Sequence, residues 1–221
     1  VMNFEMACEM VEAEGIKTKK IIVSDDIASA SEAEKLKRRG IAGMIFVFKI
    51  AGAIAETRAS LDEVFKTTSE ANNNIRTLGV ALSPCILPEA GKPTFEIGSD
   101  EIEIGMGIHG EPGIKREKLK PANELVDDLY KRIINDSKIS ENDTIAVMIN
   151  SLGATPLEEL YIVSKRLTEN FSKSKINKIK TYVGRYATSM EMAGFSITTF
   201  KLNDNLSKFM FADSECPFWT N

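Results

Sequence analysis

The sequence is poor in histidine, tryptophan and cysteine, with one, one and three of them in 221 residues. The cysteines, Cys8, Cys85 and Cys216, are odd in number and far apart in the chain. They support neither a disulfide framework nor a zinc site, because both usually show closely paired cysteines. This pattern is typical of a reducing compartment, and we expect a cytoplasmic protein.

The sequence also lacks long apolar runs and clustered cations. No apolar run approaches the roughly 20 residues that a membrane-spanning helix needs. The chain has 28 Lys and Arg against 32 Asp and Glu, and its basic runs 115–120 and 173–180 are interrupted by acidic or apolar residues. Since nucleic-acid binding needs several clustered cations, we expect neither nucleic acid nor membrane as a partner.

What is present is typical of a folded α/β protein, with 43% hydrophobic and 27% charged residues. In the first third, helical spacing covers residues 1–15, 51–56 and 61–78, and strand-like apolar runs cover residues 20–23 and 41–50. Ser60, followed three residues later by Glu63, predicts a capping box at the start of the third helix. The alternation is that of βαβ units and predicts a layered α/β fold.

After the third helix the helix-forming sequence gives way to a segment rich in proline and glycine, and this change predicts a domain boundary near residue 75. Prolines and glycines between residues 84 and 93 exclude a long helix there. The expected elements beyond them are strands over residues 95–97, 102–104 and 144–149 and helices over residues 123–135 and 156–171. We expect Thr155 to cap the last of these helices, with Pro156 at its first position. Residues 1–75 and 76–221 are thus assigned to two α/β domains.

Two carboxylates, Asp25 and Asp26, follow the first apolar run and precede the basic turn 37–40. Carboxylates at a strand end can be functional groups. A polar turn between strand and helix is the favoured interpretation here.

The most unusual segment is EIEIGMGIHGEPGI, residues 101–114, which contains the single histidine, His109. It is surrounded by Gly105, Gly107, Gly110 and Gly113. The spacing GxGxxG is also found in dinucleotide-binding loops, but these require a helix directly after the last glycine, and here Glu111-Pro112-Gly113 intervenes. A phosphate-binding P-loop would need lysine where Glu111 stands. Both nucleotide-binding interpretations are therefore disfavoured.

Acid–base or nucleophilic chemistry remains for His109. A metal site is disfavoured because the chain has no second imidazole, and the hydrolase motif GxSxG is absent. A neutral imidazole is a competent nucleophile toward a carbonyl carbon, the glycines give a small ligand access to backbone N–H groups, and Glu111 could orient the other ring nitrogen. A histidine that serves only a turn hydrogen bond is an equally weighted alternative from the residues alone.

Several strings together resemble the dihydroxyacetone (glycerone) kinases, specifically their substrate-binding subunit or domain. They are RRGIAG (38–43), KIAGAIAE (49–56), LGVALSPC (78–85), residues 89–119 with GIHGEPG, NSLGATPLEELY (150–161) and MEMAGFSIT (190–198). The resemblance covers essentially all 221 residues. It implies that His109 forms a covalent hemiaminal with the ketone carbon of dihydroxyacetone, with Gly107, Gly110 and Glu111 as further substrate-binding residues.

The resemblance also implies partners and an incomplete first domain. The family's upstream part, with a second histidine and an aspartate just before the position of Val1, is absent from this sequence. The chain is therefore expected to be inactive alone. No cofactor or metal is expected in this chain, because the nucleotide and its Mg²⁺ belong to a partner subunit. The given sequence shows no nucleotide-binding domain like that of the fused ATP-dependent kinases, so we expect the bacterial type linked to the phosphotransferase system of glycerol metabolism.

The resemblance further implies a homodimer. The alternative of a different class is a non-catalytic paralogue that binds dihydroxyacetone and co-activates a transcription regulator.

Overall fold

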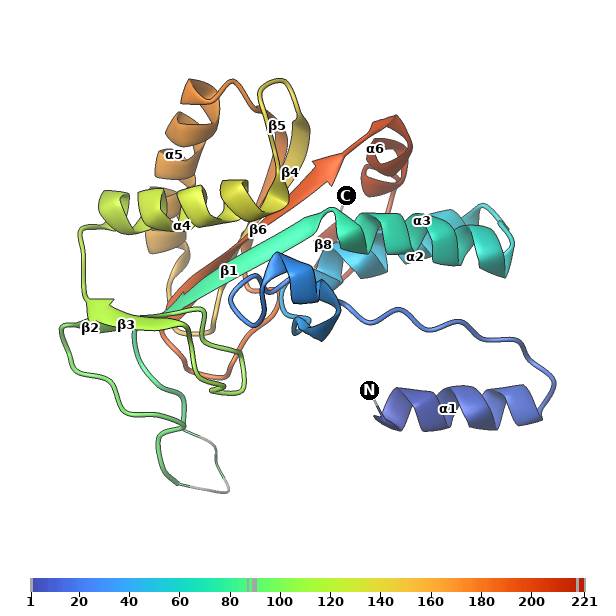
Figure 1. Cartoon of the computed structure of the whole chain (residues 1–221), viewed down its shortest axis with the longest axis horizontal. Helices are drawn as coiled ribbons and strands as arrows, with labels where there is room; N and C mark the ends of the chain where they lie inside the picture. The colour runs from blue at the N-terminus through green and yellow to red at the C-terminus, as the bar shows by residue number, and fades with distance from the viewer. Residues whose placement is uncertain (1, 87, 89–90, 218, 221) are drawn as a thin grey trace.

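A computed structural model describes residues 2–86, 88, 91–217 and 219–220. Its centre is a six-stranded sheet with the order β3-β2-β1-β6-β4-β5 (Figure 1). The strands are β1 (Ile75–Ala81), β2 (Glu101–Ile104), β3 (Lys115–Lys118), β4 (Thr144–Ser151), β5 (Asn177–Gly184) and β6 (Gly194–Leu202). Only the pair β4 and β5 is parallel among these neighbours, and a short hairpin of β7 (Glu215–Cys216) and β8 (Trp219–Thr220) lies outside the sheet. The α/β class predicted from the sequence is confirmed.

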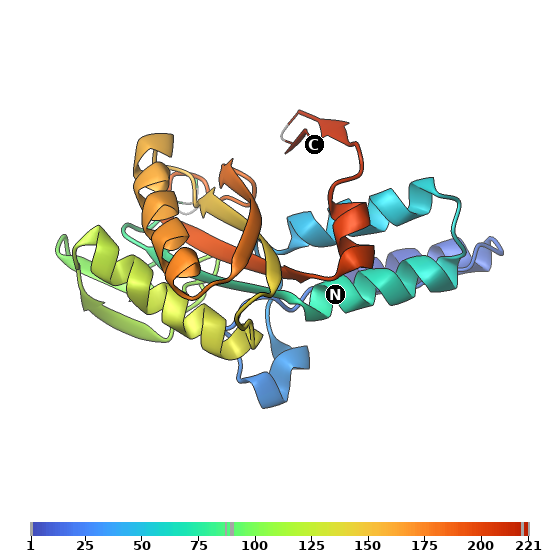
Figure 2. The same cartoon turned by 90° about the horizontal axis from the view of Figure 1, so that it is seen from above.

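Helices cover both faces of the sheet. The covering helices are α2 (Met44–Glu56), α3 (Leu61–Asn73), α4 (Ala122–Ser137), α5 (Leu157–Lys173) and α6 (Asp204–Met210). Outside them are α1 (Met2–Ala13) and a 3₁₀ helix, η1 (Glu32–Lys37). One face packs against α4 and α5, and the other against α2, α3 and α6, so that the two helix groups lie on opposite sides in Figure 2. No helix in the described ranges is long and apolar enough to cross a membrane.

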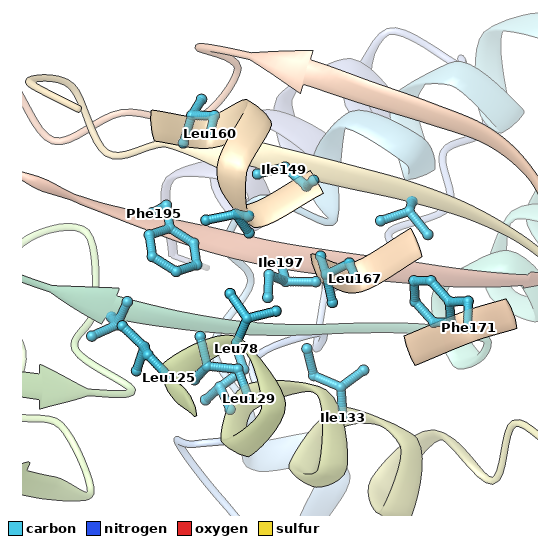
Figure 3. Close-up of a cluster of buried hydrophobic side chains, with 14 of the residues drawn as sticks. Leu78, Leu125, Leu129, Ile133, Ile149, Leu160, Leu167, Phe171, Phe195 and Ile197 are labelled. Atoms are coloured by element: carbon cyan, nitrogen blue, oxygen red, sulfur yellow. The ribbon is translucent and has the colours of Figure 1, made fainter. Parts of the chain in front are cut away.

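The alternation of side chains along β4 explains how one strand serves two cores. Ile145, Val147 and Ile149 contribute to the core under α4 and α5, whereas Ala146 and Met148 contribute to the core under α2 and α6. Successive strand residues point to opposite faces, so an uninterrupted apolar run is what a strand covered on both sides requires. Figure 3 shows the first of these cores, where side chains of α4 and α5 pack together with those of β1 and β6.

Residues 44–50 of the apolar run 41–50 lie in α2, and the prediction of this run as a strand is wrong. Asp25 fixes the turn that leads into this helix, because its buried carboxylate accepts hydrogen bonds from Ile41 N at 2.8 Å and from Gly43 N at 2.7 Å. Gly43 is the N-cap residue, whose backbone N–H has no partner within the helix. A Cβ on Gly43 would lie 2.6 Å from the Asp25 carboxyl group, so glycine is required there.

Other boundaries also differ from the expectation. The helix expected over residues 61–78 ends at Asn73, and residues 75–81 form β1, which is buried along its whole length. The strand expected over residues 95–97 does not form, and residues 20–23 are extended without a sheet partner. The helices and strands expected over residues 123–135, 102–104 and 144–149 are confirmed.

The two predicted helix starts had different outcomes. At α3 the Ser60 side chain accepts from Glu63 N while the Glu63 side chain accepts from Ser60 N, which confirms the capping box. At α5 the capping role of Thr155 is wrong, since its hydroxyl accepts from Gly194 N at 2.8 Å and the helix begins at Leu157.

Helix α1 stands apart from the rest of the molecule in Figure 1, joined to it by the extended segment 16–24. It contributes no buried residue, and Met2, Met6 and Met10 are exposed. Val1, the first residue of the expected helix, lies outside the described residues. The domain boundary near residue 75 stays a prediction.

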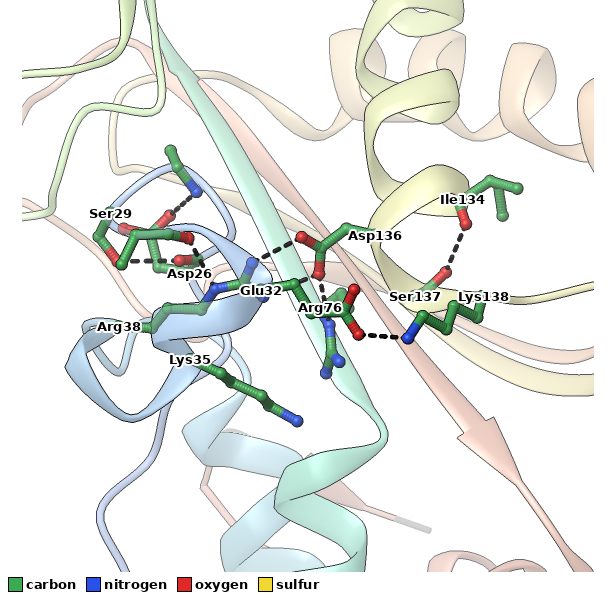
Figure 4. A network of polar contacts seen from close by, with 12 residues as sticks. Asp26, Ser29, Glu32, Lys35, Arg38, Arg76, Ile134, Asp136, Ser137 and Lys138 are labelled. Carbon is green, nitrogen blue, oxygen red and sulfur yellow. Dashed lines mark hydrogen bonds and ion pairs between the residues drawn. The ribbon is translucent and has the colours of Figure 1, made fainter.

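A buried polar network ties η1, β1 and α4 together (Figure 4). Asp136, in the last turn of α4, accepts from Arg38 Nη1 at 2.8 Å, from Arg38 Nη2 at 2.6 Å and from Arg76 Nε at 2.7 Å. The Arg38 side chain is 0% exposed and that of Arg76 is 7% exposed. Burial acts to raise the pKa of Asp136, but the two guanidinium groups lower it below its ordinary value.

Candidate functional site

The glycine-rich loop, residues 105–114, connects β2 to β3 at the edge of the sheet. Its base is closed by backbone hydrogen bonds, from Ile114 N to Ile104 O at 2.8 Å and from Gly105 N to Gly79 O at 2.8 Å. The second of these bonds joins the loop to the central strand β1. The loop therefore starts from a fixed position, although its tip is on the surface.

Within the loop the chain folds back on itself around Glu111. Gly107 N donates to Glu111 O at 3.0 Å, and Gly110 N donates to Gly107 O at 3.0 Å. Gly110 has a φ of +83°, a backbone conformation that residues with a Cβ rarely adopt. A Cβ on Gly107 would lie 2.1 Å from Glu111 Oε2, so any larger residue here would displace the carboxylate that packs against the Gly107 Cα.

The Glu111 carboxylate holds His109 at two points. Its Oε2 accepts from His109 N at 3.0 Å, and its Oε1 lies 3.3 Å from His109 Nδ1. Burial acts to raise the pKa of Glu111, but hydrogen bonds from its own backbone and from the backbone and ring of His109 lower it below its ordinary value. An ionised carboxylate only accepts hydrogen bonds, so this contact favours, in the neutral ring, the tautomer with the proton on Nδ1 and the lone pair on Nε2.

The imidazole itself points to solvent, and its side chain is 80% exposed. A lone pair on an exposed Nε2, with the other nitrogen held by a carboxylate, can attack an electrophile or exchange a proton. Of the predicted residues, His109 and Gly107 each contact Glu111.

Gly110 packs against Thr94, a residue outside the loop that precedes β2 in the chain. A Cβ there would lie 2.9 Å from Thr94 Cβ. Thr94 is held in turn by Cys85, whose carbonyl accepts from Thr94 N at 2.9 Å. Cys85 belongs to a small apolar cluster with Met106 of the loop, so Thr94 and the loop are both tied to this cluster.

Asp25 and Asp26 have separate roles. Asp25 caps α2, whereas Asp26 pairs with Arg39 beneath the glycine-rich loop, with Arg39 Nη2 donating to Gly105 O at 3.0 Å. Burial raises the pKa of Asp26 to about 6, against the opposing charge of Arg39. The sequence alone did not single out Arg39, because Arg39 is one of three basic residues in the turn 37–40.

No group of three or more His, Cys, Asp or Glu side chains in the part of the chain described is arranged to hold a metal ion. The features just described define an α/β protein that presents a single imidazole, oriented by a carboxylate, on a glycine-rich loop at a sheet edge. Such a site suits a small polar electrophile.

Comparison with known proteins gives the family. The Dak1 domain family matches residues 1–218, and the chain belongs to it. The resemblance to dihydroxyacetone kinases predicted from the sequence is confirmed.

Among the relatives, the dihydroxyacetone-binding subunit DhaK of the PTS-dependent dihydroxyacetone kinase 1 of Listeria innocua is 48% identical over 204 residues. That alignment covers 92% of this chain and 62% of the relative, so the chain spans less than two thirds of its relative's length.

Two solved structures are similar. The native dihydroxyacetone kinase of C. freundii has a TM-score of 0.88 at 32% identity, covering 99% of this chain and 39% of that one. The dihydroxyacetone kinase operon co-activator DhaQ also has a TM-score of 0.88, at 30% identity, covering 95% and 65%.

Proposed function

We propose that this chain is the dihydroxyacetone-binding part of a dihydroxyacetone kinase and that His109 holds the ketone as a covalent hemiaminal. The observation that supports this most directly is the pairing of His109 Nδ1 with the Glu111 carboxylate, which leaves Nε2 as an exposed nucleophile. The similarity to DhaK subunits supplies the substrate class.

The covalent step follows from the geometry of the two residues. Nε2 attacks the ketone carbon, a bond forms between them, and the carbonyl π electrons move to oxygen. The ring becomes positively charged, and Glu111 stabilises this charge next to Nδ1. The Nδ1 proton then leaves through water while the alkoxide oxygen gains one, so the product is a neutral hemiaminal.

Attachment through the carbonyl selects substrates by chemistry. Glycerol has no electrophilic carbon and cannot form the bond, whereas a short ketone can. Because the ketone is held covalently, its terminal hydroxyl keeps one position, which removes translational freedom before phosphoryl transfer.

Completion of the reaction needs components beyond these residues. The nucleotide and its Mg²⁺ are placed on a partner subunit that the phosphotransferase system supplies with phosphoryl groups, and the active assembly is a homodimer of the substrate-binding subunit. Residues 1–75 form the remainder of a first α/β domain whose acid–base residues precede Val1.

The hemiaminal is tested with dihydroxyacetone labelled with ¹³C at its carbonyl carbon. In NMR spectra the protein should convert the carbonyl signal to that of a tetrahedral carbon, and intact-mass measurement should show one added dihydroxyacetone. His109→Ala should lose both signals, and glycerol should give neither. An adduct that persists in His109→Ala would refute the assignment.

A second candidate function is that of a dihydroxyacetone-binding co-activator, which the similarity to DhaQ supports. Both functions keep the hemiaminal. They differ in phosphoryl transfer, so a kinase subunit should yield dihydroxyacetone phosphate when mixed with a nucleotide-loaded partner subunit, and a co-activator should not.

A further inference from the structure

Two segments far apart in the sequence meet beneath the glycine-rich loop. Residues 26–39 provide a buried carboxylate and an arginine, and residues 105–111 provide the backbone and the carboxylate that hold His109. Arg39 is the side chain that contacts both segments, and neither the family comparison nor the proposed chemistry assigns it a role.

Arg39 is held firmly on its own side. Its Nε donates to Asp26 Oδ2 at 2.8 Å, and its Nη2 lies 2.7 Å from the same oxygen. The backbone is fixed as well, because Arg39 N donates to Ser29 Oγ at 2.9 Å and Asp26 N donates to Arg39 O at 3.1 Å. The Arg39 side chain is 24% exposed and that of Asp26 is 1% exposed, so the pair is largely shielded from water.

On the other side Arg39 reaches the loop at two places. Its Nη2 donates to Gly105 O at 3.0 Å, at the first residue of the loop. A Cβ on Gly107 would lie 2.7 Å from Arg39 Nη1 and 2.1 Å from Glu111 Oε2, so the guanidinium and the carboxylate flank the same Cα. Arg39 pairs with Asp26 and Glu111 pairs with His109, so the two groups are neighbours across Gly107 without a direct ion pair. A positive charge near a carboxylate still favours its ionised form.

We propose that Arg39 is a positioning residue for His109: its guanidinium fixes the first residue of the glycine-rich loop, and its charge next to Gly107 favours the ionised Glu111 that sets the imidazole tautomer. The proposal rests on the proposed function, since it assumes that Nε2 is the reacting nitrogen. A planar guanidinium can bind Asp26 and Gly105 O at once while it lies against Gly107, because its donors point in fixed directions. A lysine ammonium keeps the charge but not this geometry.

The test uses the fact that His109 is the only histidine of this chain. In protein carrying ¹⁵N-labelled histidine, the His109 ring signals, assigned by their loss in His109→Gln, should show the Nδ1–H tautomer. Arg39→Met should give mixed tautomers and weaken adduct formation with dihydroxyacetone by about tenfold, the effect of one lost charge-assisted contact. Compared with Arg39→Met, Arg39→Lys should restore part of the Nδ1–H tautomer population and part of the adduct formation.

Arg166→Met is the matched control. Arg166 is 22% exposed and also binds an aspartate through two bonds, from Nε at 2.8 Å and Nη2 at 2.6 Å to Asp127, but it lies on α5. It should lower the urea midpoint of unfolding by less than Arg39→Met does, because Asp127 is 30% exposed whereas Asp26 is 1% exposed, and it should leave the His109 tautomer and the adduct unchanged.

The proposal is overturned if Arg39→Met keeps the parent tautomer and adduct affinity. It is also overturned if both arginine variants weaken the adduct equally, because that would reduce Arg39 to general stability. If the parent protein shows the Nδ1–H tautomer and forms no adduct, the proposed function fails while the tautomer measurement still decides the role of Arg39.

Discussion

Replacing Asp136 by asparagine should destabilise this protein far more than an ordinary surface charge change. The carboxylate accepts three hydrogen bonds from Arg38 and Arg76, and it is 17% exposed. Asparagine has nearly the same shape, but its amide group has one acceptor oxygen and presents an NH₂ group to donors. The buried guanidinium groups of Arg38 and Arg76 would then lose the negative charge that they share in the parent protein.

The magnitude follows from this loss. Breaking a buried ion pair by removing one partner costs about 3–5 kcal/mol, because the remaining charge is buried and unpaired. With a urea dependence of about 2 kcal/mol per molar, the unfolding midpoint should fall by roughly 1.5–2.5 M. Asp128→Asn, on the same helix, removes an exposed pair with Arg132 at 3.2 Å and should cost no more than about 0.5 kcal/mol.

The effect should also depend on pH. Because the folded-state pKa of Asp136 is lowered, its contribution is present above the unfolded-state pKa, about 3.8 for this side chain, and is lost as pH falls through the lower folded-state value. The difference in unfolding free energy between parent and Asp136→Asn should therefore be constant from pH 5 to 7 and shrink below roughly pH 4. Equal urea midpoints for Asp136→Asn and Asp128→Asn at pH 7 would refute the reasoning.

Three further substitutions separate the site from the core. Gly107→Ala should weaken the dihydroxyacetone adduct about tenfold, since the new Cβ would displace Glu111 from His109, and ¹³C NMR would measure this. Gly52→Ala, in α2, has open space around its Cβ and should instead stabilise the protein by about 0.5–1 kcal/mol, so a loss of adduct there would contradict the argument. Phe171→Ala removes a ring that is 1% exposed and should cost about 3–5 kcal/mol in urea unfolding with the His109 tautomer unchanged. A cost below 1 kcal/mol would mean that the core under α5 repacks.

Local signals predicted part of the fold well. The Ser60 capping box formed because its two partners are three residues apart and need nothing else. The helix α4 and the strand β4 followed from apolar spacing that the tertiary structure supports.

The wrong predictions share a non-local cause. The run 41–50 became helical although its apolar pattern also fits a strand, because the Asp25 carboxylate satisfies the start of α2 from outside the helix. Thr155 has the sequence of a capping residue, but β6 offers Gly194 N as another donor. Competition of this kind is visible only when segments distant in sequence are brought together.

In the candidate site, too, the residues predicted from the sequence are close together in the chain, and the residue that was missed is distant from them. The local motif around His109 was enough to single out the histidine, its glycines and Glu111. Arg39 lies 66 residues from Gly105 in sequence, and nothing in the turn 37–40 distinguishes it from its neighbours.

The position of β3 at the edge of the sheet has a consequence for how the molecule can be switched. The glycine-rich loop is carried by the last two strands, and β3 consists of Lys115, Arg116, Glu117 and Lys118, mostly exposed. Charged edge strands resist pairing with another sheet, and edge elements open at lower free energy than the centre of a fold. We therefore expect β3 to exchange its amide hydrogens by local opening sooner than β1, β4 and β6, whereas β2 is held by the buried side chains Ile102 and Ile104. Release of β3 alone would free one end of the glycine-rich loop, and with it the imidazole, without unfolding the protein.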